Sequence, residues 1–214
     1  MKKIKSNYNI KNIIISYVRN NLKEYILVSL IFAIGLLLGV MFINNLSEAK
    51  EQVITKYILD FLDKFKNFSQ INKTAMFWES LKNNYILVII LWFAGTTIIG
   101  IPVVIITIFF RGFCLGYTIS AFTLTLGVKK SIIFCFLTLF LQNIIFIPAI
   151  ITLVVSSIKL YKSIIKDRRK ENIKIEIIRH TLISFIVLMI LFICSFIENK
   201  ISITLLKWGI KYIM

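Results

Sequence analysis

Hydrophobic residues along this chain gather in long runs, and polar or charged residues separate them. Five such runs follow one another: Tyr25 to Ile43, Tyr85 to Phe110, Gly112 to Val128, Ser131 to Ile158 and Thr181 to Ile197. Each has about 17 residues or more, the helix length that crosses about 30 Å of hydrocarbon. The pattern therefore predicts an all-α, polytopic membrane helix bundle with about five transmembrane helices, folded as one integral membrane domain over residues 1–214.

Residues 44–84 form the one sizeable polar segment, and apolar residues recur within it at helical spacing. They fall at i, i+3, i+4 and i+7: Leu46, Val53, Ile54, Tyr57, Ile58, Phe61, Leu62, Phe65 and Phe68. This spacing predicts an amphipathic helix of about five turns. Its apolar face needs a cover, which is the bilayer surface, the rest of the chain or another protein.

The second and fourth runs carry helix-breaking residues that a simple membrane helix lacks. Gly100 and Pro102 interrupt the second run, and Pro148 interrupts the fourth. Proline removes a backbone donor and bends or breaks a helix, so carbonyl groups about one turn earlier need other partners. Thr96 and Thr97 lie close enough in sequence to supply hydroxyl groups. We therefore expect the second and fourth transmembrane helices to be kinked or broken.

Three polar side chains stand among apolar residues in the middle of the chain. Arg111 separates the second run from the third, and Gln142 and Asn143 lie within the fourth. An arginine costs far less at a membrane boundary than at the bilayer centre, so Arg111 is interpreted first as the mark of a short cytoplasmic turn. The alternative is that it folds into the bundle beside Gln142 or Asn143. Such amides are expected to bond neighbouring helices.

Pairs of glycines four residues apart occur in two runs. One pair is Gly35 and Gly39, and the other is Gly112 and Gly116. This spacing puts both glycines of a pair on one helix face, where two helices can approach closely. We expect the contact to form within the chain rather than as a dimer seam, and a homo-oligomer is left open.

Charge and composition set the orientation. Hydrophobic residues make up 58% of the chain, and the net charge of +16 comes from clustered basic residues. One cluster, residues 1–24, also carries apolar residues at helical spacing and predicts a basic helix on the membrane surface. The other is the loop 159–180. Because basic loops stay in the cytoplasm, five spans place residues 44–84 and an interfacial tail, 199–214, outside the cytoplasm.

Residue combinations typical of enzymes, metal sites and nucleic-acid interfaces are missing from the sequence. Cys114, Cys135 and Cys194 fall in apolar runs and His180 is the single histidine, so we expect no metal and no cofactor. Neither GxSxG, HExxH nor a P-loop occurs, and a basic face interleaved with aromatic residues is absent. We predict a non-enzyme that binds the lipid bilayer and no nucleic acid.

Two stretches resemble the stage II sporulation protein M family of endospore-forming bacteria. They are "GTTIIGIPVVIITIFFRGFCLGYT", Gly95 to Thr118, and "LQNIIFIPAIIT", Leu141 to Thr152. In that family a Gly-x-Pro second span, a Gly-x-x-x-Gly third segment, and Gln-Asn followed by Ile-Pro occur in this order. The chain departs from the pattern at Leu141, where relatives are expected to have proline.

The resemblance implies a mother-cell protein at the septal and engulfing membrane. It helps to localise two peptidoglycan hydrolases, stage II sporulation protein P, an amidase and endopeptidase, and stage II sporulation protein D, a lytic transglycosylase. We therefore expect a non-catalytic scaffold for forespore engulfment. The predicted partner contacts are Tyr57, Phe61, Phe65 and Phe68, unless that face lies on the bilayer or packs on the bundle.

Under the scaffold hypothesis, the intramembrane polar and kink-forming residues have a structural role. We expect them to hold the shape of the bundle: Thr96, Thr97, Gly100, Pro102, Arg111, Gly112, Gly116, Gln142, Asn143 and Pro148. The alternative is a small-solute transporter or permease subunit, because broken helices with polar groups also form midplane substrate sites. Against it stand the missing internal repeat and the absence of acidic residues from the runs.

Overall fold

The computed structural model describes residues 10–66, 73–166 and 170–197, and these ranges contain helices joined by short turns and no strand. They are α1 (Ile10–Asn20), α2 (Leu22–Asn44), α3 (Glu48–Lys66), α4 (Lys73–Gly95), α5 (Ile101–Leu126), α6 (Val128–Cys135), the π-helical segment η2 (Phe136–Phe140), α7 (Leu141–Lys166) and α8 (Lys170–Ile197). The all-α prediction is therefore confirmed. The predicted tail, 199–214, and the first residues of the predicted surface helix lie outside the described ranges.

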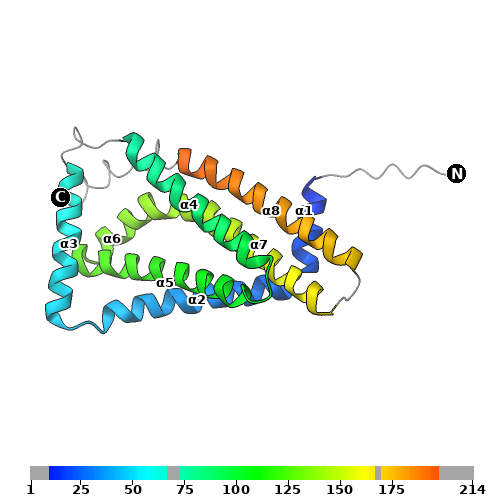
Figure 1. Ribbon diagram of the computed structural model, residues 1–214. Helices are drawn as coiled ribbons and strands as arrows, with labels where there is room; N and C mark the ends of the chain where they lie inside the picture. Colours follow the sequence, from blue (N-terminus) through cyan, green and yellow to red (C-terminus); the bar gives the residue numbers. More distant parts are fainter. Residues whose placement is uncertain (1–9, 67–72, 167–169, 198–214) are drawn as a thin grey trace.

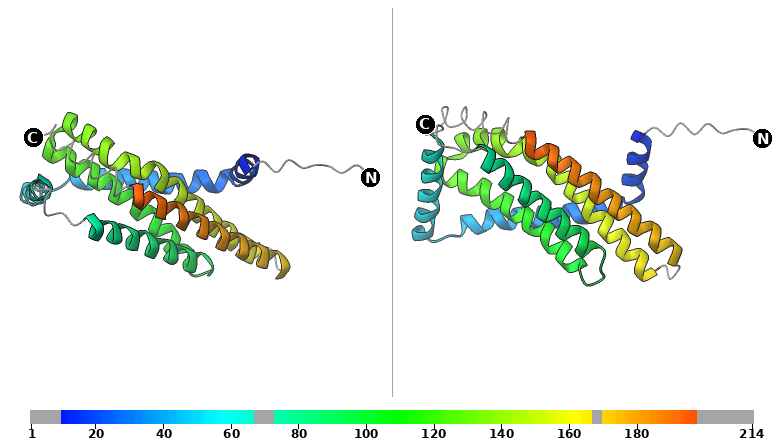
Figure 2. Two further views of the ribbon diagram at one scale, coloured as in Figure 1. Left: turned by 90° about the horizontal axis from the view of Figure 1, so that it is seen from above. Right: turned by 45° about the horizontal axis from the view of Figure 1, so that its top comes forward.

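The long helices α2, α4, α5, α7 and α8 lie side by side and form one bundle (Figure 1). α2, α5 and α8 run in one direction along it, and α4 and α7 run in the other. α3 lies across one end of the bundle and α1 lies at the opposite end (Figures 1 and 2). The two polar helices thus cap an apolar body.

Four helical stretches are long and apolar enough to cross a membrane: Leu22–Asn44, Ile101–Leu126, Asn143–Ile165 and Ile173–Phe196. α4 has 23 residues, as many as α2. Its first half is polar, however, and its apolar part is only Tyr85 to Gly95. The chain is a multi-pass membrane protein in which α4 packs against helices that are long and apolar enough to span the membrane.

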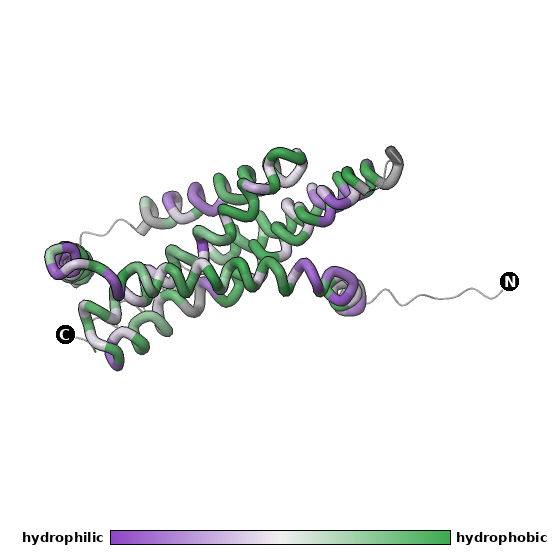
Figure 3. Tube along the Cα trace, turned by 90° about the horizontal axis from the view of Figure 1, so that it is seen from below, coloured by the Kyte–Doolittle hydropathy of each residue, from purple (hydrophilic) through white to green (hydrophobic). Residues whose placement is uncertain are grey.

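The outer surface of the bundle is apolar. Large hydrophobic side chains are exposed on each long helix, for example Leu37 on α2, Phe93 on α4, Ile106 on α5, Ile144 on α7 and Phe185 on α8. Figure 3 shows hydrophobic residues along the bundle, with hydrophilic residues gathered mostly at its ends and on α3. Lipid, in which exposed apolar surface costs nothing, is the solvent that suits this distribution.

The core of the bundle forms around α7. Leu153, Val154 and Val155 are 0% exposed. They belong to one cluster with residues from the other long helices: Val28, Leu91, Val104 and Leu191. The valine side chains have restricted rotamers, and together with the leucines they fill the interior closely. α7 is therefore the central helix of the bundle.

The predicted turn at Arg111 is wrong. α5 is one continuous helix of 26 residues, and Arg111 and Gly112 lie inside it. The chain turns earlier, at residues 96–100, so the second span ends at Gly95 rather than Phe110. The physical reason is that arginine is a good helix former, whereas Pro102 occupies the first turn of α5, where its missing N–H costs nothing.

The fourth span is irregular, but not at its proline. α6 is followed directly by the π-helical segment η2 at Phe136–Phe140. α7 comes next, and Pro148 lies inside this helix. Side chains bond the carbonyl groups near this change: the Thr138 hydroxyl donates to the Phe134 oxygen at 2.7 Å, and the Asn143 amide donates to the Leu139 oxygen at 2.8 Å. The side chain of Gln142 lies outside what the structure describes.

Candidate functional site

Two helices that carry paired glycines, α2 and α5, pack backbone against backbone. A Cβ atom built on Gly39 would overlap the carbonyl oxygen of Phe113, and one on Gly112 would overlap the carbonyl oxygen of Phe32. Gly35 and Gly116 make the same kind of contact. Contacts this close let Cα–H groups approach carbonyl oxygens, which favours helix association in lipid. The structure therefore places both glycine pairs at one contact within the chain.

The turn between α4 and α5 is closed by threonine hydroxyls. Thr96 Oγ1 donates to the Phe93 carbonyl at 2.7 Å, and Thr97 Oγ1 donates to the Ala94 carbonyl at 3.1 Å. Thr97 Oγ1 also accepts the Gly100 N–H at 3.1 Å. A Cβ on Gly100 would overlap the Ala94 backbone. These residues shape a tight connection at one end of the bundle, and they bond helix ends rather than a ligand.

Arg111 lies near the middle of α5, about 15 Å along the helix from its start at a rise of about 1.5 Å per residue. Its guanidinium carbon is 5.1 Å from the centre of the Phe146 ring. A cation over an aromatic ring gains about 0.5–2 kcal/mol, whereas an arginine at the bilayer centre costs about 2.5–3.5 kcal/mol. The ring therefore offsets only part of the cost of placing the charge there.

A cavity of about 160 Å³ lies beside Arg111, between α2, α5 and α7. Asn143 and Thr118 are its other polar wall residues. Most of the wall is apolar: Phe32, Ile108, Cys114, Leu115, Leu139, Phe146, Ile147 and Ile150. Since a water molecule takes about 30 Å³ of liquid volume, the space suits a few waters or one side chain. Arg111 and Asn143 thus share one site, as the alternative interpretation of Arg111 expected.

A second polar cluster lies where α4, α7 and α8 meet near α1. His180 is 0% exposed and its two ring nitrogens contact different helices. Nδ1 is 3.1 Å from Ser156 Oγ on α7, and Nε2 is 3.4 Å from the Trp92 carbonyl oxygen on α4. Gly95 leaves the room, since a Cβ there would lie 2.8 Å from His180 Nε2. His180 therefore joins three helices.

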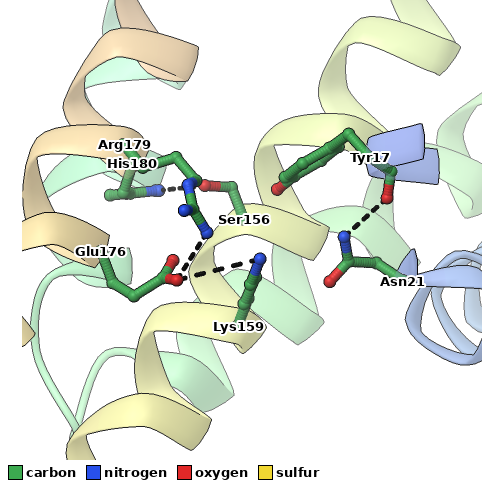
Figure 4. A network of polar contacts seen from close by, with 7 residues as sticks. All are labelled: Tyr17, Asn21, Ser156, Lys159, Glu176, Arg179 and His180. Carbon is green, nitrogen blue, oxygen red and sulfur yellow. Dashed lines mark hydrogen bonds and ion pairs between the residues drawn. The ribbon is translucent and has the colours of Figure 1, made fainter. Parts of the chain in front are cut away.

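Ion pairs surround this histidine on the side of α1 (Figure 4). Glu176 Oε1 accepts from Arg179 at 2.5 Å and lies 3.8 Å from Lys159 Nζ. Nearby, Lys162 Nζ donates to Glu24 Oε1 at 2.6 Å and links α7 to α2. All these groups are partly exposed, so each pair is worth about 0–1 kcal/mol. Their arrangement still fixes which ends of the helices lie together.

Tyr17 docks α1 onto the same region. The Lys159 ammonium lies 5.3 Å from the centre of the Tyr17 ring. The Tyr17 hydroxyl is buried and makes no hydrogen bond within the described chain. Burial raises the pKa of this hydroxyl to about 12, an effect that the neighbouring Ser156 hydroxyl partly offsets. The phenol is therefore neutral at physiological pH and contributes packing rather than charge.

The cluster around His180 was not predicted from sequence. Ser156 and His180 are 3% and 0% exposed, so no substrate reaches the pair, and its contacts are structural. A signal was present, because a serine pair, Ser156 and Ser157, interrupts an apolar run and His180 opens another. Which of these residues meet across helices depends on tertiary packing, which one sequence does not contain.

α3 is held to the end of the bundle by one face. Ile58 and Leu62 are buried in a cluster with Ile43, Ala121 and Phe134. Phe61 is half-buried and packs against the same cluster. Tyr57, by contrast, points away from this cluster and is 74% exposed. The rest of the chain therefore covers the apolar face that the sequence predicted.

The four residues predicted to contact partners are separated by this arrangement. Tyr57 is on the open side of α3 and Phe61 is on the packed side. The side chain of Phe65, and the whole of Phe68, lie outside the described residues. Val53, one turn before Tyr57, is 68% exposed and joins it on the open side.

A known protein family matches the part of the chain that contains most of these features. The family model for stage II sporulation protein M matches residues 28–203. The match includes both glycine pairs, the turn at residues 96–100, the Arg111 cavity and α3. No curated protein and no solved structure gives a significant match to the chain.

Proposed function

Because the chain belongs to the stage II sporulation protein M family, we propose that it is a non-catalytic membrane scaffold that localises septal peptidoglycan hydrolases during forespore engulfment. Membership of this family implies that the chain is a sporulation-related membrane protein. The proposed partners are stage II sporulation protein P, an amidase and endopeptidase, and stage II sporulation protein D, a lytic transglycosylase. The chain would supply position and its partners would supply the chemistry.

The distribution of charge supports an orientation for this scaffold. α1, the end of α7 and the start of α8 lie at one end of the bundle. The sequence segments to which they belong, residues 1–24 and 159–180, are rich in lysine and arginine. Basic segments stay in the cytoplasm, so this end is assigned to the cytoplasmic side. The opposite end, with α3, then faces the space that contains peptidoglycan. The end of α8 faces the same space.

The single observation that carries the proposal is the setting of α3. Ile58 and Leu62 fix the helix across the end of the bundle, while Val53 and Tyr57 stand open on its other side. An exposed tyrosine beside an aliphatic residue is the kind of surface that protein partners use, because aromatic residues supply large contact area. α3 thus offers a rigid, outward platform for extracytoplasmic enzymes.

Co-purification of the full-length chain with the amidase from membranes tests the platform. Replacing Val53 and Tyr57 together by serine is expected to lower amidase recovery several-fold, since these side chains make no buried contact that folding needs. Gln52→Ala is the matched control, because Gln52 is exposed on α3 but points about 100° away from Val53. Unchanged recovery at equal expression would contradict the proposal.

A small-solute transporter is the second candidate, and the cavity beside Arg111 is the observation that favours it. A transport path needs water access to this cavity from both sides of the membrane. Asn143→Cys, combined with Cys114→Ser, is therefore tested with a water-soluble thiol reagent. Labelling from both sides would favour transport, and protection from both sides would favour the scaffold.

A further inference from the structure

One face of α5 carries a row of polar and small residues in the middle of the membrane. Thr107, Arg111, Cys114 and Thr118 follow one another at intervals of four, three and four residues. This is the heptad spacing with which one helix contacts another along a seam. All four side chains are partly or fully exposed. The row therefore lies open on the surface of the bundle.

The hydroxyl groups of this row are already satisfied by their own helix. Thr107 Oγ1 donates to the Val103 carbonyl at 2.7 Å, and Thr118 Oγ1 donates to the Cys114 carbonyl at 2.8 Å. Such threonines present small, nearly apolar surfaces that let another helix approach closely. Arg111 is the exception, because its charge has no such internal partner.

Among the described residues, Arg111 has no counter-charge. No acidic side chain of the described residues forms an ion pair with Arg111, and the acidic groups nearest the spans, Glu24 and Glu176, pair with other cations. The sequence has no aspartate or glutamate between Glu79 and Asp167. A second copy of the chain would therefore bring no carboxylate to this depth.

The depth also decides what kind of molecule can supply the charge. Arg111 is about 15 Å from the start of α5, near the middle of a layer about 30 Å thick. Phospholipid phosphates lie at the edges of that layer. A carboxylate reaches the middle when a transmembrane helix carries it, because intramembrane charges pair with one another across helices.

We propose that the face of α5 around Arg111 binds the transmembrane helix of another protein that carries an aspartate or glutamate near its middle. The carboxylate enters the cavity beside Asn143 and pairs with the guanidinium, while Thr107, Cys114 and Thr118 contact the partner helix. The inference does not depend on the hydrolases of the proposed function, since it concerns intramembrane chemistry alone.

Vesicles of neutral phosphatidylcholine that contain the full-length chain test this inference. The probe is a synthetic transmembrane peptide of leucine and alanine with one central aspartate, and its match has asparagine there. Energy transfer between a dye on the peptide and a dye on the chain at Lys129→Cys measures binding. The aspartate peptide is expected to bind roughly tenfold more tightly than the asparagine peptide.

The preference should depend on the charge at position 111. Arg111→Gln is expected to bind both peptides equally, and Arg111→Lys is expected to keep most of the preference. Arg19→Gln, which removes an exposed charge from α1, is the matched control and should behave like the original chain. Thermal unfolding of each variant verifies that the bundle is folded.

Cys114 gives a readout of position. A cysteine placed one turn after the aspartate in the peptide is expected to cross-link to Cys114 under a membrane-permeant oxidant, and Cys114→Ser should abolish the product. Equal binding of the two peptides to the original chain, or an aspartate preference that survives Arg111→Gln, would overturn the inference. Arg111-dependent binding of laurate without any aspartate preference would also overturn it, by assigning the site to a free carboxylate.

Discussion

Gly116 on α5 lies directly against the carbonyl group of Leu36 on α2, with no room for a Cβ atom between them. Gly39 on α2 meets the carbonyl group of Phe113 on α5 in the same way. The Gly-x-x-x-Gly face of α2 thus packs directly against the Gly-x-x-x-Gly face of α5 within a single chain. A homo-oligomer that used these glycines would first have to separate α2 from α5.

Adding a methyl group to this contact is expected to destabilise the bundle. Gly39→Ala and Gly116→Ala each place a Cβ on a backbone carbonyl oxygen, which no rotamer change can move away. The cost should reach the upper part of the range for overpacking, roughly 1–3 kcal/mol. Thermal unfolding in detergent measures it. Ala33→Val, on the exposed side of α2, is the control and should change little.

The turn between α4 and α5 should depend on its glycine more than on its proline. Gly100→Ala forces a Cβ into the Ala94 backbone, so a loss of roughly 1–3 kcal/mol is expected. Pro102→Ala removes only the stiffening of the unfolded chain, which is worth about 0.4–1 kcal/mol. The two variants are compared in one unfolding experiment. A larger effect at Pro102 would argue against its place in the first turn of the helix.

Removing the His180 ring should loosen three helices together. His180→Leu leaves Ser156 Oγ and the Trp92 carbonyl without their shared partner, so a loss of about 1–3 kcal/mol is expected. Thr181→Val provides the comparison, because it removes only the exposed bond from Trp92 Nε1. If both variants unfolded at the same temperature, His180 would not be a connecting residue.

The Tyr17 hydroxyl is expected to be dispensable, whereas its ring is not. Tyr17→Phe removes a buried hydroxyl that has no partner among the described residues, so α1 should stay docked. Tyr17→Ala removes the ring that contacts Lys159 and should release α1. Limited trypsin digestion measures this, because release speeds cleavage at the exposed Arg19. Equal cleavage rates in the two variants would contradict the prediction.

The same contact sets a pH dependence at the alkaline end. Folding raises the pKa of Tyr17 from 10.0 to about 12, so the docked state favours the protonated phenol. The stability that this provides is fully present below pH 10 and is lost as the pH rises towards 12. Cleavage at Arg19 is therefore expected to speed up in that window, and Tyr17→Phe should remove this part of the pH dependence.

Thiol labelling of intact cells tests the orientation. Lys129→Cys should react with a membrane-impermeant maleimide from outside, because residue 129 lies at the end of the bundle that bears α3. Ile99→Cys should react only after the cells are opened, because the exposed Ile99 lies in the turn at the other end. Both are made with Cys114→Ser. Labelling of both positions from the same side would refute the alternating arrangement of the helices.

The hydrophobic pattern was enough to predict α2 and α3, because run length in α2 and residue spacing in α3 are both local properties of the sequence. The long apolar run Tyr25 to Ile43 became a helix of nearly the same extent. The i, i+3, i+4 pattern of α3 placed Ile58 and Leu62 on the buried face. In both helices the pattern of apolar residues can be seen within the segment itself, so the helix can be predicted without knowing its neighbours.

Arg111 shows where such reasoning stops. Its charge suggested a turn, yet Arg111 lies inside a continuous helix, beside Phe146 of α7 and a cavity whose few polar wall residues include Asn143. That environment comes from residues more than thirty positions later in the chain. The energy of an intramembrane charge depends on such distant neighbours, so its position could not be decided from local sequence.

The polar first half of α4 has an effect on the surrounding lipid. Only about 16 Å of this helix, Tyr85 to Gly95, is continuously apolar, about half the thickness of the hydrocarbon layer. Asn84 is sheltered because its amide donates to Ser195 on α8 at 2.9 Å, but Lys82 and Asn83 are exposed. This hydrophobic mismatch favours a locally thinned leaflet beside the polar half of α4, on the side of the bundle that bears α3. Membrane regions that are already thin or strongly curved would accommodate the protein with the least deformation.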